Sequence, residues 1–164
     1  MKKIWIYRIT SSGATMLELV FLHYLTLHYL SASGGIPFFD IRPVWDPVRL
    51  ADITENLSPL ARSIYDRMQL VDLLFPLFYT ATLLVWVPVS RRKSHLLVAF
   101  IASGALCDYG ENLIIHQLLH HPKSLSQIFL TVLPYITTIK FTCIIFSLCL
   151  IIMMYIRRAI RGTC

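Results

Sequence analysis

The chain has 164 residues, of which 56% are hydrophobic and only 15% are charged. A soluble domain usually carries about 25% charged residues, so this composition, with a mean hydropathy of +0.64, excludes a water-soluble fold and indicates a membrane protein. The net charge of +6 could suggest a nucleic-acid partner. However, the basic residues flank apolar segments and form no basic helix interleaved with exposed aromatics, so we expect no nucleic acid.

Four apolar segments have the length of about 20 residues that a helix needs to cross a bilayer. They run from Ile9 to Leu30, from Gln69 to Val89, from Leu96 to Leu119 and from Ile128 to Ile156. We therefore predict an all-α fold in which residues 1–164 form a single membrane domain, an integral four-helix bundle in the lipid bilayer. The first segment could instead be a cleaved signal peptide, but Glu18 and His23 interrupt the apolar region that a signal peptide needs.

Lysine and arginine cluster in three places that a four-span fold would put on one side of the membrane. The clusters are Lys2, Lys3 and Arg8, then Arg91, Arg92 and Lys93, and finally Arg157, Arg158 and Arg161. Because short cytoplasmic segments are enriched in basic residues, we predict that both termini face the cytoplasm.

The outer loop, residues 31–67, is too long for a simple turn. Asp46 as an N-cap and Pro47 after it predict a short helix at the membrane interface. Ser58 and Pro59 repeat this signal and predict a second helix that runs into the second span. The aromatic stretch GGIPFFDIRPVW before them suits a headgroup-level anchor or a lid over the bundle.

Five ionisable side chains fall inside the predicted spans, where each costs at least about 2.5–3.5 kcal/mol to insert. They are Glu18, Asp72, Asp108, Glu111 and Lys140. Because Lys140 is the one cation among four acids, we predict that its ammonium pairs with Asp108 or Glu18. The remaining acids must be protonated, hydrogen-bonded, metal-bound or paired with a cationic ligand.

The third span carries its polar residues on one helix face. Asp108, Asn112, His116 and His120 are four apart, and Glu111 lies one turn after Asp108. We predict that this stripe lines a pocket shared with the second span, and that Gly110 lets a neighbouring helix or a ligand approach the backbone closely.

On the second span, Asp72, Pro76 and Tyr79 share a face. Pro76 has no backbone N–H and should free a carbonyl near Asp72, which in a membrane needs a polar neighbour or a cavity. A simple proline kink is the alternative interpretation.

These patterns predict a buried acidic site in the outer half of the bundle that binds or transforms a lipid-soluble ligand, such as a sterol, an isoprenoid or a quinone. The candidate acid/base residues are Asp72, Asp108 and Glu111, and the candidate ligand-binding residues are Glu18, Tyr79, Asn112, His116 and Lys140. The architecture is similar to that of four-span sterol-isomerase and sigma-receptor-like proteins, which also carry intramembrane acids. The second-span sequence VDLLFPLFY departs from their pattern, so the similarity extends to architecture alone.

Three alternatives stay open. The acids could hold Zn, Mn or Fe, although Glu111 and His116 lack the Glu-x-x-His spacing of bundle metal sites and none of the four cysteines sits in a CxxC pair. They could belong to a non-enzymatic membrane subunit or proton relay, with a membrane-protein partner or a second copy of the chain. They could also be polar contacts that fix the helix register. No nucleotide-binding or serine-hydrolase motif is present, and no cofactor is indicated.

Overall fold

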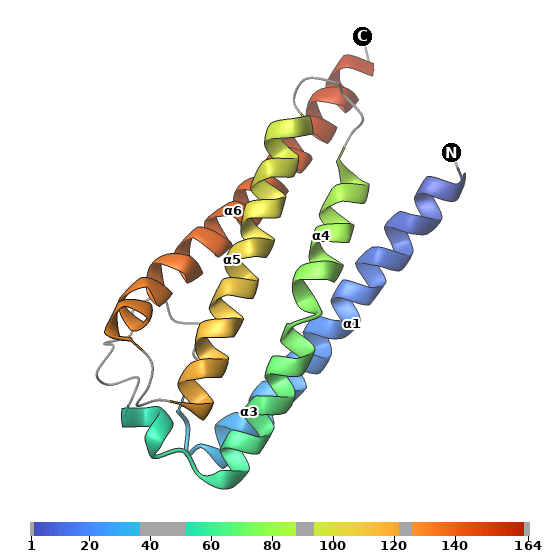
Figure 1. Cartoon of the computed structure of the whole chain (residues 1–164). Helices are drawn as coiled ribbons and strands as arrows, with labels where there is room; N and C mark the ends of the chain where they lie inside the picture. Colours follow the sequence, from blue (N-terminus) through green and yellow to red (C-terminus); the bar gives the residue numbers. More distant parts are fainter. Residues whose placement is uncertain (1, 37–51, 88–93, 122–125, 163–164) are drawn as a thin grey trace.

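A computed structural model of the chain describes residues 2–36, 52–87, 94–121 and 126–162. In these ranges the protein is all-helical and contains no strand. The helices are α1 (Lys2–Ala32), α3 (Pro59–Asp72), α4 (Phe75–Trp86), α5 (Ser94–His120) and α6 (Gln127–Gly162). The helices run alternately in opposite directions along a common axis, so both termini lie at the same end of the molecule (Figure 1).

Three helical segments of the described chain are long and apolar enough to cross a membrane. They are Pro59–Trp86, His95–His120 and Gln127–Ile160. Most residues of these segments are not buried inside the protein, so apolar side chains cover its outer surface. This is compatible with a multi-pass membrane protein. α1 is 31 residues long but is not among the three, so its role as a fourth span stays a prediction.

The second predicted span consists of two helices joined end to end. The helix that was predicted to start at Ser58 and Pro59 and to run into this span begins at Pro59. The predicted N-cap is confirmed, since the Ser58 hydroxyl accepts a hydrogen bond from the Ala61 N–H at 3.1 Å. The same hydroxyl lies 3.2 Å from the carbonyl of Ala32 and donates to it, which joins the start of α3 to the end of α1.

The predicted short helix of the outer loop is seen in part, because residues 52–55 are helical. Its predicted cap at Asp46 and the aromatic stretch lie mostly outside the described residues. Arg62 of α3 holds the helical turn in place by donating to the carbonyl of Thr54 at 2.7 Å and to that of Leu119. The guanidinium thereby also satisfies a carbonyl at the C-terminal end of α5, where a positive charge is favourable.

The interior has two apolar clusters with a polar layer between them. The cluster at the loop end includes Tyr29, Tyr65, Met68, Ile115 and Leu133. The cluster toward the termini includes Tyr79, Leu83, Leu97, Ile101 and Ile151. The buried polar layer contains Glu18, Asp72, Asp108, Glu111, Asn112, Thr137 and Lys140. The inner faces of α5, of α6 and of α3 and α4 taken together therefore change from apolar to polar and back to apolar.

Candidate functional site

Lys140 of α6 reaches across to two carboxylates of α5. Its Nζ lies 3.3 Å from Oδ1 of Asp108 and also forms an ion pair with Glu111. The hydroxyl of Thr137, one turn before Lys140, donates to the other oxygen of Glu111. We call these four residues the ion-pair network. The predicted pairing of Lys140 with Asp108 is confirmed, whereas Glu111 is a partner that the prediction did not include.

The ion-pair network is buried between the helices. Asp108 and Glu111 are each only 1% exposed, and Lys140 is 6% exposed. In such an environment, an isolated charge would be very costly, but opposite charges that are held in contact offset part of each other's desolvation. The network joins α5 to α6.

A second polar contact crosses from α5 to the break between α3 and α4. Pro76 cannot donate a backbone hydrogen bond to the carbonyl of Asp72, four residues earlier. The Asn112 side chain donates to that carbonyl instead, over 3.5 Å. The predicted effect of Pro76 is thus confirmed, with the side chain of Asn112 as the polar neighbour.

Glu18 of α1 is the acid of the polar layer that has no partner. It is 7% exposed, and neither carboxylate oxygen has a hydrogen-bond partner within the described part of the chain. One turn away, the hydroxyls of Thr15 and Thr82 lie 2.8 Å apart and join α1 to α4. Of the two partners predicted for Lys140, the structure shows Asp108 and not Glu18.

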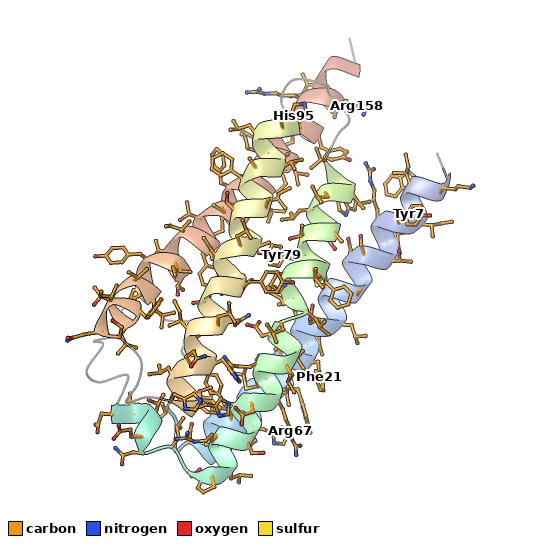
Figure 2. The ribbon with its side chains drawn as sticks, viewed as in Figure 1. Tyr7, Phe21, Arg67, Tyr79, His95 and Arg158 are labelled. Carbon is orange, nitrogen blue, oxygen red and sulfur yellow. The ribbon has the colours of Figure 1, made fainter. Side chains whose placement is uncertain are left out.

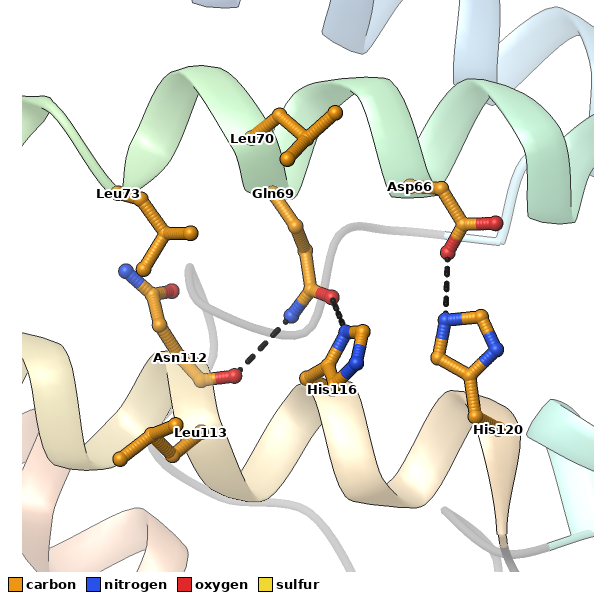
Figure 3. A pocket seen from close by; sticks show the side chains of 8 residues that line it. All are labelled: Asp66, Gln69, Leu70, Leu73, Asn112, Leu113, His116 and His120. Carbon is orange, nitrogen blue, oxygen red and sulfur yellow. Dashed lines mark hydrogen bonds and ion pairs between the residues drawn. The ribbon is translucent and has the colours of Figure 1, made fainter.

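A groove of about 290 Å³ lies between α3 and α5, on the loop side of the polar layer. Its lining residues are Asp66, Gln69, Leu70, Leu73, Asn112, Leu113, His116 and His120. Figure 3 shows the two helices facing each other across it, with polar side chains along the floor. We call this site the α3–α5 groove.

The polar floor of the groove is held by a series of hydrogen bonds. The Gln69 amide nitrogen donates to the carbonyl of Asn112 at 3.3 Å, and its oxygen lies 3.3 Å from Nδ1 of His116 (Figure 3). At the outer end, His120 lies 3.1 Å from Asp66. Asn112 and His116 therefore line a cavity as predicted. Asp72, Asp108 and Glu111 do not line this groove, so the pocket predicted for these acids stays a prediction.

Tyr79 and the glycines of α5 also differ from the prediction. Tyr79 projects from α4 at mid-height of the molecule (Figure 2) and belongs to the apolar cluster toward the termini, not to the groove. A methyl group at Gly110 would meet no atom within 4 Å, so no neighbouring helix of the described structure makes the predicted close approach there. The close approach is at Gly104, where the methyl group would lie 3.3 Å from Cβ of Cys143 and 3.7 Å from the Tyr79 hydroxyl.

The sequence analysis missed Gln69 and Thr137, which complete the groove floor and the ion-pair network. Gln69 had a detectable signal, since it lies one turn before Asp72 on the same helix face. Thr137 likewise lies one turn before Lys140. Among the described residues, no group of three or more His, Cys, Asp or Glu side chains is placed to hold a metal ion.

Comparisons with known proteins add no further assignment. The chain matches no protein-family model, no curated protein and no solved structure. Function must therefore be argued from the geometry of the site.

Proposed function

We propose that this protein is a four-span membrane protein that binds a lipid-soluble, amphiphilic molecule in the α3–α5 groove. In this proposal α1 is the fourth span, both termini face the cytoplasm, and the loop of residues 31–67 lies on the opposite side. The basic clusters near the termini support this orientation, because both termini lie at one end of the molecule (Figure 1).

The proposal rests on the contrast between the apolar mouth of the groove and its buried polar floor. Leu70, Leu73 and Leu113 line it with apolar side chains that are themselves exposed at the surface. Gln69 and Asn112 on the floor are buried. An amphiphile could enter sideways from the bilayer, leave its apolar part among the leucines and place its polar group on the floor. The volume of about 290 Å³ is near the lower limit of small-molecule pockets, about 300 Å³.

The floor favours a ligand that donates hydrogen bonds. The Gln69 amide nitrogen is used on a backbone carbonyl, so its oxygen faces His116 as an acceptor and Nδ1 of a neutral His116 must carry the proton. The other ring nitrogen, Nε2, is then an acceptor. The side-chain oxygen of Asn112 is a second acceptor that has no partner among the described residues. A hydroxyl group, as in a sterol, an isoprenoid alcohol or a reduced quinone, fits this pair of acceptors, and so does an amine.

We propose that the protein binds this molecule and does not convert it chemically. Asp108 and Glu111, the acids expected to exchange protons with a substrate, are held by Lys140 and do not line the groove. General acid–base catalysis needs its donor within hydrogen-bond reach of the reacting atoms. The groove itself offers His116 as a titratable group close to the floor.

The test is to fill the mouth of the groove without disturbing the fold. Leu113 is 65% exposed, so Leu113→Trp should fold normally and obstruct the groove. Leu106, 72% exposed and two turns away on the same helix face, provides the matched control Leu106→Trp. Purified protein in lipid nanodiscs is titrated with a sterol, an isoprenoid alcohol, a quinol and an amphiphilic amine. We expect at least one to bind, with its affinity lowered about tenfold or more by Leu113→Trp alone. Equal effects of both variants, or no binding by any compound, would contradict the proposal.

A proton path is the second candidate function, because a row of polar groups leads from the loop end to the polar layer. It passes from Asp66 through His120 and His116 to Gln69 and Asn112. The two amides cannot release a proton readily, which favours binding over conduction. A pH-sensitive dye inside liposomes distinguishes the two, since a proton path predicts acidification that His116→Leu abolishes.

A further inference from the structure

A second cavity, at the end of the molecule that carries both termini, has the features of an anion site. Its volume is about 460 Å³, and it lies between α1, the end of α4 and α6. Two arginines, Arg8 and Arg158, line it together with Tyr7, Ile4 and Leu84. Figure 2 labels Tyr7 and Arg158 at this end of the molecule. The α3–α5 groove lies toward the opposite end, so the two sites are separate.

Arg8 is held in a fixed orientation. Its Nε donates to the carbonyl of Val85 at 3.2 Å. Its guanidinium carbon lies 5.5, 4.9 and 5.6 Å from the ring centroids of Trp5, Trp86 and Tyr155. Cation–π contacts of this kind stabilise the charge and limit the movement of the side chain. Within the described residues, the hydrogen bond to Val85 uses only Nε of Arg8. The two terminal nitrogens of the guanidinium therefore remain available to a ligand.

Among the side chains of the described residues, no carboxylate lines this cavity. Two basic clusters lie at this end of the molecule, at the start of α1 (Lys2, Lys3 and Arg8) and at the end of α6 (Arg157, Arg158 and Arg161). Two arginines with no acidic side chain in the described lining attract an anion, and a guanidinium pairs with two oxygens of a phosphate group.

The remaining walls indicate where that phosphate comes from. Ile4 and Leu84 in the lining are exposed apolar side chains. Tyr7 in the lining, and Trp5 and Trp86 beside Arg8, are residue types that gather at a membrane–water interface. An acyl chain can lie along such a surface while its headgroup phosphate contacts the arginines. A free phosphate ion would use the arginines and leave the apolar wall without a function.

We propose that this cavity binds the headgroup of an anionic phospholipid through Arg8 and Arg158, with the acyl chain against Ile4 and Leu84. Basic pockets between membrane helices are known to hold such headgroups. This inference requires a membrane environment but not the ligand proposed for the α3–α5 groove.

The test compares two neighbouring arginines in the full-length protein. Arg158→Gln removes a cavity cation, and Arg157→Gln removes the same charge from an exposed position on the same helix that does not line the cavity. Protein in neutral detergent is titrated with phosphatidylglycerol or phosphatidylcholine, and bound lipid is counted by native mass spectrometry. We expect preferential binding of phosphatidylglycerol that weakens about tenfold in Arg158→Gln and changes little in Arg157→Gln.

Two further measurements separate a lipid from a free anion. Ile4→Trp keeps every charge but fills the apolar side of the cavity, so it should also weaken phosphatidylglycerol binding. Inorganic phosphate at millimolar concentration should not displace the lipid. The proposal is overturned by equal losses in the two arginine variants, by an unchanged affinity in Ile4→Trp, by displacement with inorganic phosphate, or by equal binding of both lipids.

Discussion

The two sides of α5 carry similar polar residues but use them differently. Toward α6, Asp108 and Glu111 meet Lys140, and the ion-pair network is buried and internally neutralised in part. Toward α3, Asn112 and His116 meet Gln69, and an open groove lies beside this contact. A polar residue in a membrane helix is therefore not by itself a binding site. It can bind a ligand only where the neighbouring helices leave its side chain accessible.

The largest effect is expected from breaking the ion-pair network at its cation. Lys140→Met leaves Asp108 and Glu111 buried without their ammonium partner, which typically costs about 3–5 kcal/mol. We expect a large fall in melting temperature in detergent. Adding Asp108→Asn and Glu111→Gln to the variant should restore much of the stability, because no buried charge then lacks a partner. An unchanged melting temperature for Lys140→Met alone would refute the structural role of the network.

A smaller effect is expected at the contact between Asn112 and the proline break. Asn112→Leu removes the donor to the Asp72 carbonyl, and an unsatisfied buried carbonyl costs about 1–3 kcal/mol. Pro76→Ala supplies a backbone N–H that can bond this carbonyl, so the loss on Asn112→Leu should shrink in that background. The measurement is a double-mutant cycle on the free energy of unfolding in mixed micelles. Strict additivity would show that the two residues do not share the carbonyl.

These residues also show which features of the site could be predicted from the sequence. The charge balance predicted that Lys140 pairs with an acid, and the proline predicted a carbonyl in need of a donor, because both follow from costs that any membrane interior imposes. Which helix faces α5 on each side depends on tertiary packing, so Glu111 as a partner of Lys140 and Gln69 as a partner of His116 were missed. Leu70 and Leu113 were not recognisable as groove walls, since apolar side chains look alike all around a membrane helix.

Substitutions at the two glycines of α5 should change the stability of the protein by different amounts. Gly104→Leu places a side chain against Cys143 and Tyr79 and should destabilise the protein by about 1–3 kcal/mol. Gly110→Leu meets open space and should change stability by less than about 0.5 kcal/mol. Melting curves of both variants in the same detergent make the comparison. The reverse order would mean that α5 packs against its neighbours through a different face.

The smallest effect on ligand binding is expected from Glu111→Gln. Glutamine keeps an oxygen that can accept from Thr137, and Asp108 remains as the anionic partner of Lys140, although the ion pair between Glu111 and Lys140 is lost. We expect the affinity for any groove ligand to change less than about threefold, which is below about 1 kcal/mol. Loss of binding with the fold intact would move the site from the groove to the acids.

We propose that an amphiphilic ligand lies between α3 and α5 and not among the buried acids. Photoaffinity labelling in nanodiscs with a diazirine analogue of whichever amphiphile binds, followed by peptide mapping by mass spectrometry, locates this ligand. Labelling is predicted at Leu70, Leu73 and Leu113, and unlabelled ligand should compete it away. Competed labelling on α6 around Lys140, or label spread equally over exposed leucines such as Leu106, would contradict the claim.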